Sequence, residues 1–329
     1  MLSTSPPRQT VRTVLGDIAP EQLGTTNYHE HLFQISPLLP GDELDDEALS
    51  EREATLLASS GFQAMVDATP IGLGRRPEAL ARISANTGLT VIATTGRHRE
   101  AHYPDSHPIH RLTAQELGAR FTRELLHGLP VSDDGEEIAR TASNEPVKAG
   151  VLKAAVGYWS VSQFEHDSLA GVGIAHRHSG APVMVHLEHC SAAHEVLDLL
   201  EQMGVSSTAV CLAHADRLLD AGLHVSLIER GAVLGYDGMA RTKTHSDEQL
   251  IELTARVISQ GGVSNILLGG DVARKTRYLA YGGMPGLEYL GKRYLPRLRD
   301  KVGPDALRQI LVDNAARWLA WQPKAGNGD

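Results

Sequence analysis

Short apolar runs recur along the chain, each ended by a polar residue or a glycine, and they predict β-strands. Several runs, such as VMVHL and ILLGGD, are apolar on successive residues, which is typical of strands buried on both faces in a parallel sheet. The predicted strands are Thr25–Leu32, Phe62–Thr69, Leu89–Gly96, Ala149–Val156, Pro182–Glu188, Ala209–Asp216, Ala232–Asp237 and Asn265–Asp271.

Helical periodicity lies between these runs, and Ser246 with Gln249 predicts a capping box at the start of one helix. The predicted helices are Ala48–Ser59, Pro77–Ala85, Thr113–Leu126, Ser191–Met203 and Ser246–Ser259. Eight strands alternating with helices predict a (β/α)8 TIM barrel. A doubly wound open sheet is the alternative, but no GxGxxG motif follows the first strand.

No linker divides the chain, so we expect a single domain over residues 1–329. Residues 1–24 are predicted to form an N-terminal extension or hairpin, and residues 286–329 to include the helices that close the barrel. The loop-rich segments 97–112 and 129–147 are predicted insertions around the third and fourth strands.

Composition narrows the class of protein. The chain has 42% hydrophobic residues and a net charge of -9, which argues against disorder and against nonspecific nucleic-acid binding. We expect no membrane span, because no apolar stretch approaches about 20 residues. We also expect no secretory signal, because the first ten residues contain no apolar core. Its two cysteines, Cys190 and Cys211, cannot form a disulfide framework, so a cytoplasmic location is expected. The 16 histidines are the unusual feature, since histidine is the commonest metal ligand.

Side chains that bind metals follow or interrupt several predicted strands. In a barrel of this type the chemistry lies at the C-terminal ends of the strands, and residues two apart on a strand face the same side. Each polar residue alone is more simply a structural residue, but together they would be severely destabilising in a barrel interior without a compensating cation. The candidates are His29, His31, Lys153, His186, His214 and Asp271.

Lys153 is the unusual member of this set. Burial and neighbouring cations both lower the pKa of a lysine and favour its neutral amine. A neutral amine can add carbon dioxide to form a carbamate, whose two oxygens can bridge two metal ions.

The sequence resembles the phosphotriesterase family of the amidohydrolase superfamily, and within it the lactonase branch. The resemblance rests on TVLGDIAPEQLGTTNYHEHL, AGVLKAAV, VMVHLEHC, VCLAHAD and LLGGDVARKTRYLAYGG, which occur in the expected order over nearly the whole chain. It implies a homodimer and a binuclear centre, with zinc the first expectation and manganese or cobalt the alternatives. By motif, His29, His31 and Asp271 would hold one ion, His186 and His214 the other, and carboxylated Lys153 would bridge them.

Such a centre predicts a metal-dependent hydrolase acting on ester bonds. Two ions that share a water lower its pKa, so hydroxide is available for attack on the substrate near neutral pH. Asp271 would accept the proton of this water and pass it toward the leaving group.

Basic residues gather in the loops after strands 2, 3, 7 and 8 and predict a small anionic substrate. They are Arg75, Arg76, Arg97, Arg99, Arg241, Lys243, Arg274, Lys275 and Arg277. If a helix opens after Asp271, Arg274 and Arg277 share one face of it. Family members that resemble hydrolases of phosphorylated sugar lactones carry a lysine and basic or phenolic residues at the places of Lys243, Arg274 and Arg277, although a tyrosine is expected at the last place. The predicted substrate-binding residues are Lys243, Arg274, Arg277, Arg97 and His98.

The basic residues have a simpler interpretation, in which they pair with acids such as Asp237, Asp247 or Glu100, or line a subunit contact. Three functions therefore compete: a lactonase for phosphorylated or anionic sugar lactones, a phosphotriesterase or acyl-lactone hydrolase, and a noncatalytic ligand-binding barrel. Among the residues with weaker signals, Tyr28 supports the HxH motif or packs in the core, and Asp67 has no evident place among the ligands.

Overall fold

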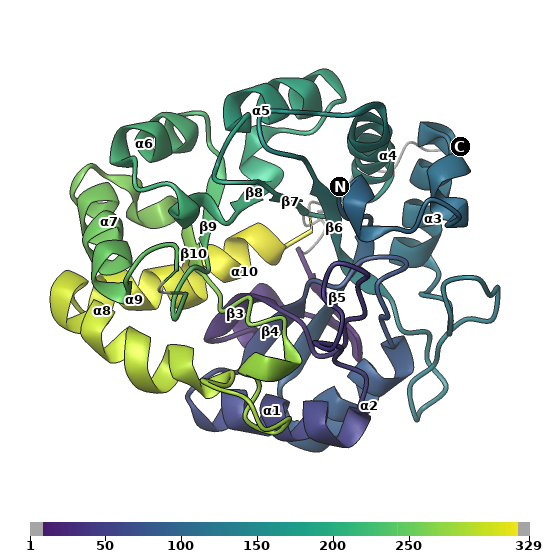
Figure 1. Ribbon diagram of the computed structural model, residues 1–329, viewed down its shortest axis with the longest axis horizontal. Coiled ribbons are helices and arrows are strands. Elements are labelled where there is room, and N and C mark those ends of the chain that lie inside the picture. The colour runs from purple at the N-terminus through teal and green to yellow at the C-terminus, as the bar shows by residue number, and fades with distance from the viewer. Residues whose placement is uncertain (1–8, 242, 322–329) are drawn as a thin grey trace, which may run out of the picture.

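Eight parallel strands form a nearly closed barrel in the computed structural model, which describes residues 9–241 and 243–321 (Figure 1). The barrel strands are β3 (Thr26–Glu30), β4 (Ala64–Asp67), β5 (Thr90–Gly96), β6 (Ala149–Ala155), β7 (Val183–His186), β8 (Val210–Ala213), β9 (Val233–Tyr236) and β10 (Ile266–Leu268). Each strand pairs in parallel with the next. The ring is completed where the Asp271 amide donates to the His29 carbonyl at 2.9 Å. The predicted TIM barrel is confirmed.

Helices surround this barrel (Figure 1). They are α1 (Glu47–Ser59), α2 (Pro77–Thr87), α3 (Ala114–Leu126), α4 (Gln163–Ser179), α5 (Ala193–Gln202), α6 (Ala221–Glu229), α7 (Asp247–Ser259), α8 (Leu295–Val302), α9 (Pro304–Arg308) and α10 (Asn314–Leu319). Of these, α1, α2, α3, α5 and α7 lie where the sequence pattern predicts helices. The capping box of Ser246 and Gln249 is present at the start of α7. Helices α4 and α6 were not predicted from the sequence. No helix of the described ranges is long and apolar enough to cross a membrane.

The N-terminal end of the barrel is closed by segments from both ends of the chain. Strands β1 (Val11–Thr13) and β2 (Gly16–Ile18) form an antiparallel hairpin. The Trp321 indole donates to the Gly150 carbonyl at 2.8 Å, and the buried Trp318 of α10 packs against the barrel interior. Because these segments cover the N-terminal end of the barrel, a polar site can open only at the opposite, C-terminal end.

The strand periodicity explains how charged side chains enter the barrel. Val151 on β6 and Met184 on β7 belong to the apolar cluster that fills the interior. Lys153 and His186 come two residues later on the same strands, so they face the same side one step nearer the C-terminal end. The apolar layer therefore forms the floor on which the polar layer lies.

Candidate metal centre

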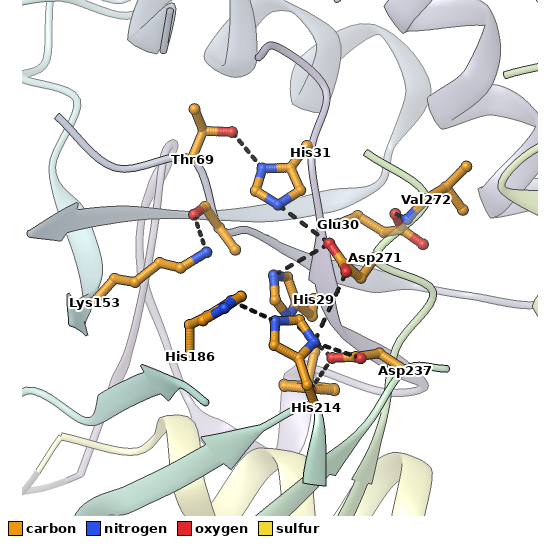
Figure 2. Close-up of polar contacts among 12 residues, drawn as sticks. His29, Glu30, His31, Thr69, Lys153, His186, His214, Asp237, Asp271 and Val272 are labelled. Carbon is orange, nitrogen blue, oxygen red and sulfur yellow. Dashed lines mark hydrogen bonds and ion pairs between the residues drawn. The ribbon is translucent and has the colours of Figure 1, made fainter. Parts of the chain in front are cut away.

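All six predicted metal ligands line one cavity of about 380 Å³ at the C-terminal end of the barrel. Figure 2 shows their side chains converging from different strands and strand-following loops. All six are buried, with side-chain nitrogens or carboxylate oxygens turned toward one another. The sequence prediction of which residues gather in space therefore agrees with the structure.

The hydrogen bonds around His29 and His31 assign a tautomer to each ring. His29 Nδ1 lies 3.2 Å from a carboxylate oxygen of Asp237, which can only accept, so Nδ1 carries the proton. His31 Nδ1 lies 2.8 Å from Thr69 Oγ1, whose own hydrogen is donated to the Phe33 carbonyl, so this Nδ1 is also the donor. Both rings thus direct an unprotonated Nε2 into the cavity, which is the form that binds metal.

The same reasoning applies to His214 and His186. His214 Nδ1 donates to Asp237 Oδ1 at 2.6 Å, and His186 Nε2 donates to Glu188 Oε1 at 2.8 Å. The remaining nitrogens, His214 Nε2 and His186 Nδ1, face each other at 2.8 Å. With both rings neutral these are two lone pairs in contact, which a bound cation or a shared proton satisfies. The facing His214 Nε2 and His186 Nδ1 atoms are therefore suited to bind a cation between them.

A divalent ion fits the first three ligands. His29 Nε2 is buried without a hydrogen-bond partner among the described residues. It lies 3.7 Å from Asp271 Oδ1, and His31 Nε2 lies 3.6 Å from the same oxygen, which is too long for hydrogen bonds. Ligand atoms that share a tetrahedral ion about 2 Å away lie about 3.3 Å apart, so this spacing suits a common ion. Burial lowers the pKa of both imidazoles to about 4, which keeps them in the ligand form at neutral pH.

Lys153 is buried among these groups. Its Nζ donates to the Ala68 carbonyl at 2.8 Å, and burial lowers its pKa to about 8. The backbone of Lys153 on β6 packs closely against Gly96 on β5. A Cβ at Gly96 would lie 1.9 Å from the Lys153 carbonyl oxygen. Gly96, with φ of +124°, is therefore required for this strand pair to position the lysine.

Asp271 has a left-handed backbone, with φ of 42°, as does His214, with φ of 61°. Such conformations are costly for residues other than glycine, and they gather at functional sites. Asp271 Oδ2 also accepts ion pairs from Arg241 at 2.5 Å and from Arg217 at 3.4 Å. Burial alone would raise the pKa of Asp271, but Arg241 and the imidazoles lower it well below its usual value, so it stays ionised.

Asp237 is a functional residue that the sequence reasoning missed. From the sequence it is expected only as a partner for basic loop residues, but its two oxygens accept from His29 and His214, and Tyr28 also donates to it. The available signal was its place directly after β9, which makes it a polar residue at a strand end. Asp67 lies outside the cavity lining, as expected, and accepts the Thr69 amide beside His31.

We predict that Asp237→Asn lowers metal affinity about 10- to 100-fold. An asparagine offers only one acceptor oxygen, so its NH2 group opposes the Nδ1–H of His29 or His214 and disfavours the ligand tautomer. Metal affinity is measured by chelator competition, with exposed Asp105→Asn as the matched control. An unchanged affinity would contradict this role, and the melting temperature of the metal-free protein separates it from a loss of folding.

Four arginines among the residues that the structure describes also line the cavity: Arg99, Arg217, Arg241 and Arg274. Arg99 lies 3.0 Å and Arg217 4.0 Å from Glu188, so both are held at one side of the cavity. Arg274 is half exposed and lies 3.5 Å from Asp42. These arginines do pair with acids, as the simpler interpretation expects, but the partners are Glu188, Asp42 and Asp271, and not the expected Asp237, Asp247 or Glu100.

Two arginines that the sequence analysis associated with the loops are buried in the framework. Arg97, predicted to bind substrate, lies behind the cavity wall, where it stacks on Phe164 and donates to two backbone carbonyls. Arg75 forms buried ion pairs with Glu124 at 2.7 Å and with Asp133 at 2.6 Å. The structure does not bring either guanidinium into the cavity, because local acceptors bind each one.

In the part of the chain that the structure describes, no α-helix opens directly after Asp271, so the condition under which Arg274 and Arg277 would share one helix face is not met. The segment contains only a 3-10 turn at Lys275–Arg277, because Asp42 accepts hydrogen bonds from Thr276 and tethers this loop to a neighbouring one. Arg274 therefore lines the cavity, while Arg277 turns away and lies 3.4 Å from the Val272 carbonyl. Lys243 is exposed and lies outside the cavity lining, so its contact with the substrate stays a prediction. His98, the fifth predicted substrate-binding residue, does line the cavity.

Comparison with known proteins agrees with this geometry. A model of the phosphotriesterase family matches residues 9–319. The chain belongs to the phosphotriesterase family. A phospho-furanose lactonase from Mycoplasmopsis synoviae is 28% identical, with 95% of this chain and 92% of that protein aligned. An N-acetyltaurine hydrolase from Danio rerio is 27% identical over 96% of this chain and 99% of that protein. A lactonase from Listeria monocytogenes is 30% identical, with a TM-score of 0.86 over 95% of this chain and 100% of that one.

Proposed function

We propose that this phosphotriesterase-family hydrolase is a lactonase that opens a phosphorylated or otherwise anionic sugar lactone. The observation that carries the proposal is the combination, in one cavity, of a metal-ligand set with four arginines. Arginine suits recognition of phosphate and carboxylate groups. The similarity to a phospho-furanose lactonase supports this substrate class.

The proposed cofactor is a pair of divalent ions, with zinc preferred by the imidazole and carboxylate ligands. His29, His31 and Asp271 would hold one ion, and His186 with His214 the other. Lys153 is proposed to bridge them as a carbamate, which its lowered pKa favours. When bound, the ions would supply Lewis acidity and a water of lowered pKa.

The protein's own groups account for proton transfer and substrate orientation. The Asp271 carboxylate can accept a proton from the attacking water and return it to the ring oxygen as the ester C–O bond breaks. Arg241 and Arg217 hold this carboxylate in place through its Oδ2 atom. Arg274 is half exposed and lies 3.5 Å from Asp42, so its guanidinium can exchange this contact for the substrate anion.

The cavity lining argues against a neutral organophosphate as the main substrate. Among the described residues that line it, only Leu38, Leu39 and Ala273 are apolar. An apolar triester would leave many buried polar groups without partners, which costs affinity. The noncatalytic alternative requires a degenerate ligand set, whereas all the expected ligand residues face the cavity.

A substrate panel tests the proposal. The zinc-loaded enzyme is assayed with a phosphorylated aldonolactone, the same lactone without phosphate, an uncharged acyl lactone, paraoxon and N-acetyltaurine. The highest kcat/KM is expected for the phosphorylated lactone. Faster turnover of paraoxon or of the amide would overturn the proposed substrate class. A purified protein with less than one equivalent of metal and no activity after addition of zinc or manganese would overturn an enzymatic role.

We predict that Arg274→Ala raises KM for the phosphorylated lactone about tenfold or more, because a charge-assisted hydrogen bond to the phosphate is lost. KM for the unphosphorylated lactone should change much less. Steady-state kinetics on both substrates provide the measurement, and exposed Arg293→Ala is the matched control. Equal losses on the two lactones would exclude a role in anion recognition.

A further inference from the structure

A second group of polar side chains lines the same cavity and takes no part in the metal binding or proton transfer described above, although His98 is among the predicted substrate-binding residues. His98 and His102 lie in the segment after β5, and Gln34 lies in the segment after β3. Their exposed fractions are 7%, 8% and 6%, so each is nearly buried. The His98 and His102 rings are 3.8 Å apart between centroids, and His98 is 4.6 Å from the His186 ring. The two histidine rings therefore lie side by side next to a metal ligand, and Ser36, two residues after Gln34, lies 3.0 Å from His102 Nδ1, which places the Gln34 segment beside them.

His98 presents a hydrogen-bond donor to the cavity. Its Nδ1 accepts the backbone N–H of Arg99 at 2.8 Å, and a backbone N–H can only donate. In the neutral ring the proton is therefore on Nε2. This tautomer is the reverse of the one assigned to His29, His31 and His214, whose cavity-facing nitrogens are unprotonated.

His102, like His98, carries its ring proton on Nε2. Its Nδ1 lies 3.0 Å from Ser36 Oγ, which already accepts the Leu38 amide at 3.2 Å. Among the described residues the Ser36 hydroxyl hydrogen has no acceptor other than His102 Nδ1, so Ser36 donates to this nitrogen and the proton of His102 is on Nε2. Burial lowers the pKa of His102 to about 3, which agrees with a neutral ring. Because both rings present N–H groups, they are unsuited to bind an additional metal ion.

Gln34 supplies the complementary acceptor. Its Oε1 is buried and has no hydrogen-bond partner among the residues that the structure describes. A buried amide oxygen without a partner is costly, so it marks a place where a bound molecule can donate a hydrogen bond. The Gln34 backbone is held by hydrogen bonds with Leu44 in both directions, at 3.0 and 2.8 Å, which makes this position well defined.

We propose that Gln34 and His102, with His98, form a subsite that recognises hydroxyl groups of the substrate. A hydroxyl donates one hydrogen bond and accepts others, so it can donate to Gln34 Oε1 while it accepts from an imidazole N–H. A carboxylate or phosphate would satisfy the two histidines but not the acceptor oxygen of Gln34. The subsite therefore selects a polyhydroxylated lactone over a deoxy or acyl lactone. This inference rests on the proposed lactonase function and specifies its substrate class.

The test compares a phosphorylated lactone with hydroxyls on carbons 2 and 3 and its 2-deoxy and 3-deoxy counterparts. Wild type should prefer the dihydroxy lactone over at least one deoxy lactone by at least tenfold in kcat/KM. Gln34→Met and His102→Phe should reduce this ratio at least fivefold, and His102→Gln, which can restore a donor, should recover part of it. The matched control is Gln163→Met, on the exposed side of α4. A wild type without preference, or variants that keep it, would overturn the subsite.

Equilibrium binding keeps this test independent of turnover. Titration calorimetry of the zinc-loaded protein with the corresponding phosphorylated aldonate and deoxyaldonates should show the same preference and the same loss in the variants. If no lactone is opened but the aldonate preference is present, the lactonase proposal fails while the hydroxyl subsite stands. If lactones are opened without any preference in turnover or binding, the subsite fails while the lactonase proposal stands.

Discussion

Asp271→Asn is expected to lower kcat/KM for the preferred lactone about 10³-fold, which is within the range for loss of a positioned proton acceptor. The substitution removes the negative charge that faces His29 and His31 and that balances Arg241 and Arg217. Asparagine tolerates the left-handed backbone of this position, and Arg241 also donates to the Asp271 backbone carbonyl. The loss of activity in Asp271→Asn should therefore come from the missing carboxylate, because the fold is retained.

Metal content and kinetics measured together distinguish the two roles of Asp271. A variant that keeps both ions but loses kcat identifies proton transfer as the main role, whereas a variant that loses one ion identifies coordination. Asp198→Asn, at a carboxylate on α5 that is 59% exposed, controls for the general effect of removing an acid. An Asp271→Asn enzyme within tenfold of wild type and with full metal content would show that the carboxylate has neither role.

The strand pattern predicted the barrel and most of the ligand layer because both depend on local periodicity. Buried parallel strands have continuous apolar runs, so a lysine or histidine inside such a run is conspicuous. Lys153 and His186 each follow an interior apolar residue by two positions, which is enough to orient them. Their convergence follows from the barrel itself, which brings the C-terminal ends of all strands together.

Tertiary packing determined what the pattern did not show. Helix α4 contains Gly171 and Gly173, which disfavour a helix intrinsically. A Cβ at Gly171 would lie 2.8 Å from Leu117 of α3, and one at Gly118 of α3 would lie 2.7 Å from Ile174. Gly171 and Gly118 permit close packing of α3 and α4, so Gly171, which weakens the helical pattern of α4 in the sequence, also stabilises the position of this helix in the fold.

The partners of charged residues could not be predicted from the sequence either. Arg75 and Arg97 lie in segments that follow strands, as cavity residues do, but acceptors far away in sequence determine where they lie. Asp237 is separated from His29 by more than half of the chain, yet the two side chains are in contact. Local spacing in the sequence identifies the type of chemistry at a strand end. Only the three-dimensional contacts show which carboxylate or carbonyl binds each histidine or arginine.

Lys153→Ala is expected to abolish tight binding of one of the two ions and to lower kcat/KM about 10³-fold, since several kcal/mol of charge stabilisation depend on the metal pair. Alanine removes the buried amine and its hydrogen bond to the Ala68 carbonyl, and leaves space where a small acid can enter. Acetate or propionate should therefore restore part of the activity and of the metal content, because their carboxylates supply the two oxygens of the proposed carbamate.

Two controls make the Lys153 experiment specific. Lys292→Ala, at an exposed lysine of the segment before α8, should behave as wild type, and Asp271→Asn should not be rescued by the same acids. Metal-free wild type should regain activity more slowly in buffer depleted of carbon dioxide and faster when bicarbonate is added, since carbamate formation requires carbon dioxide. Full activity of Lys153→Ala without added acid would exclude the bridging role. Reactivation of wild type at a rate independent of bicarbonate would instead show that the neutral amine, and not its carbamate, is the group required at this position.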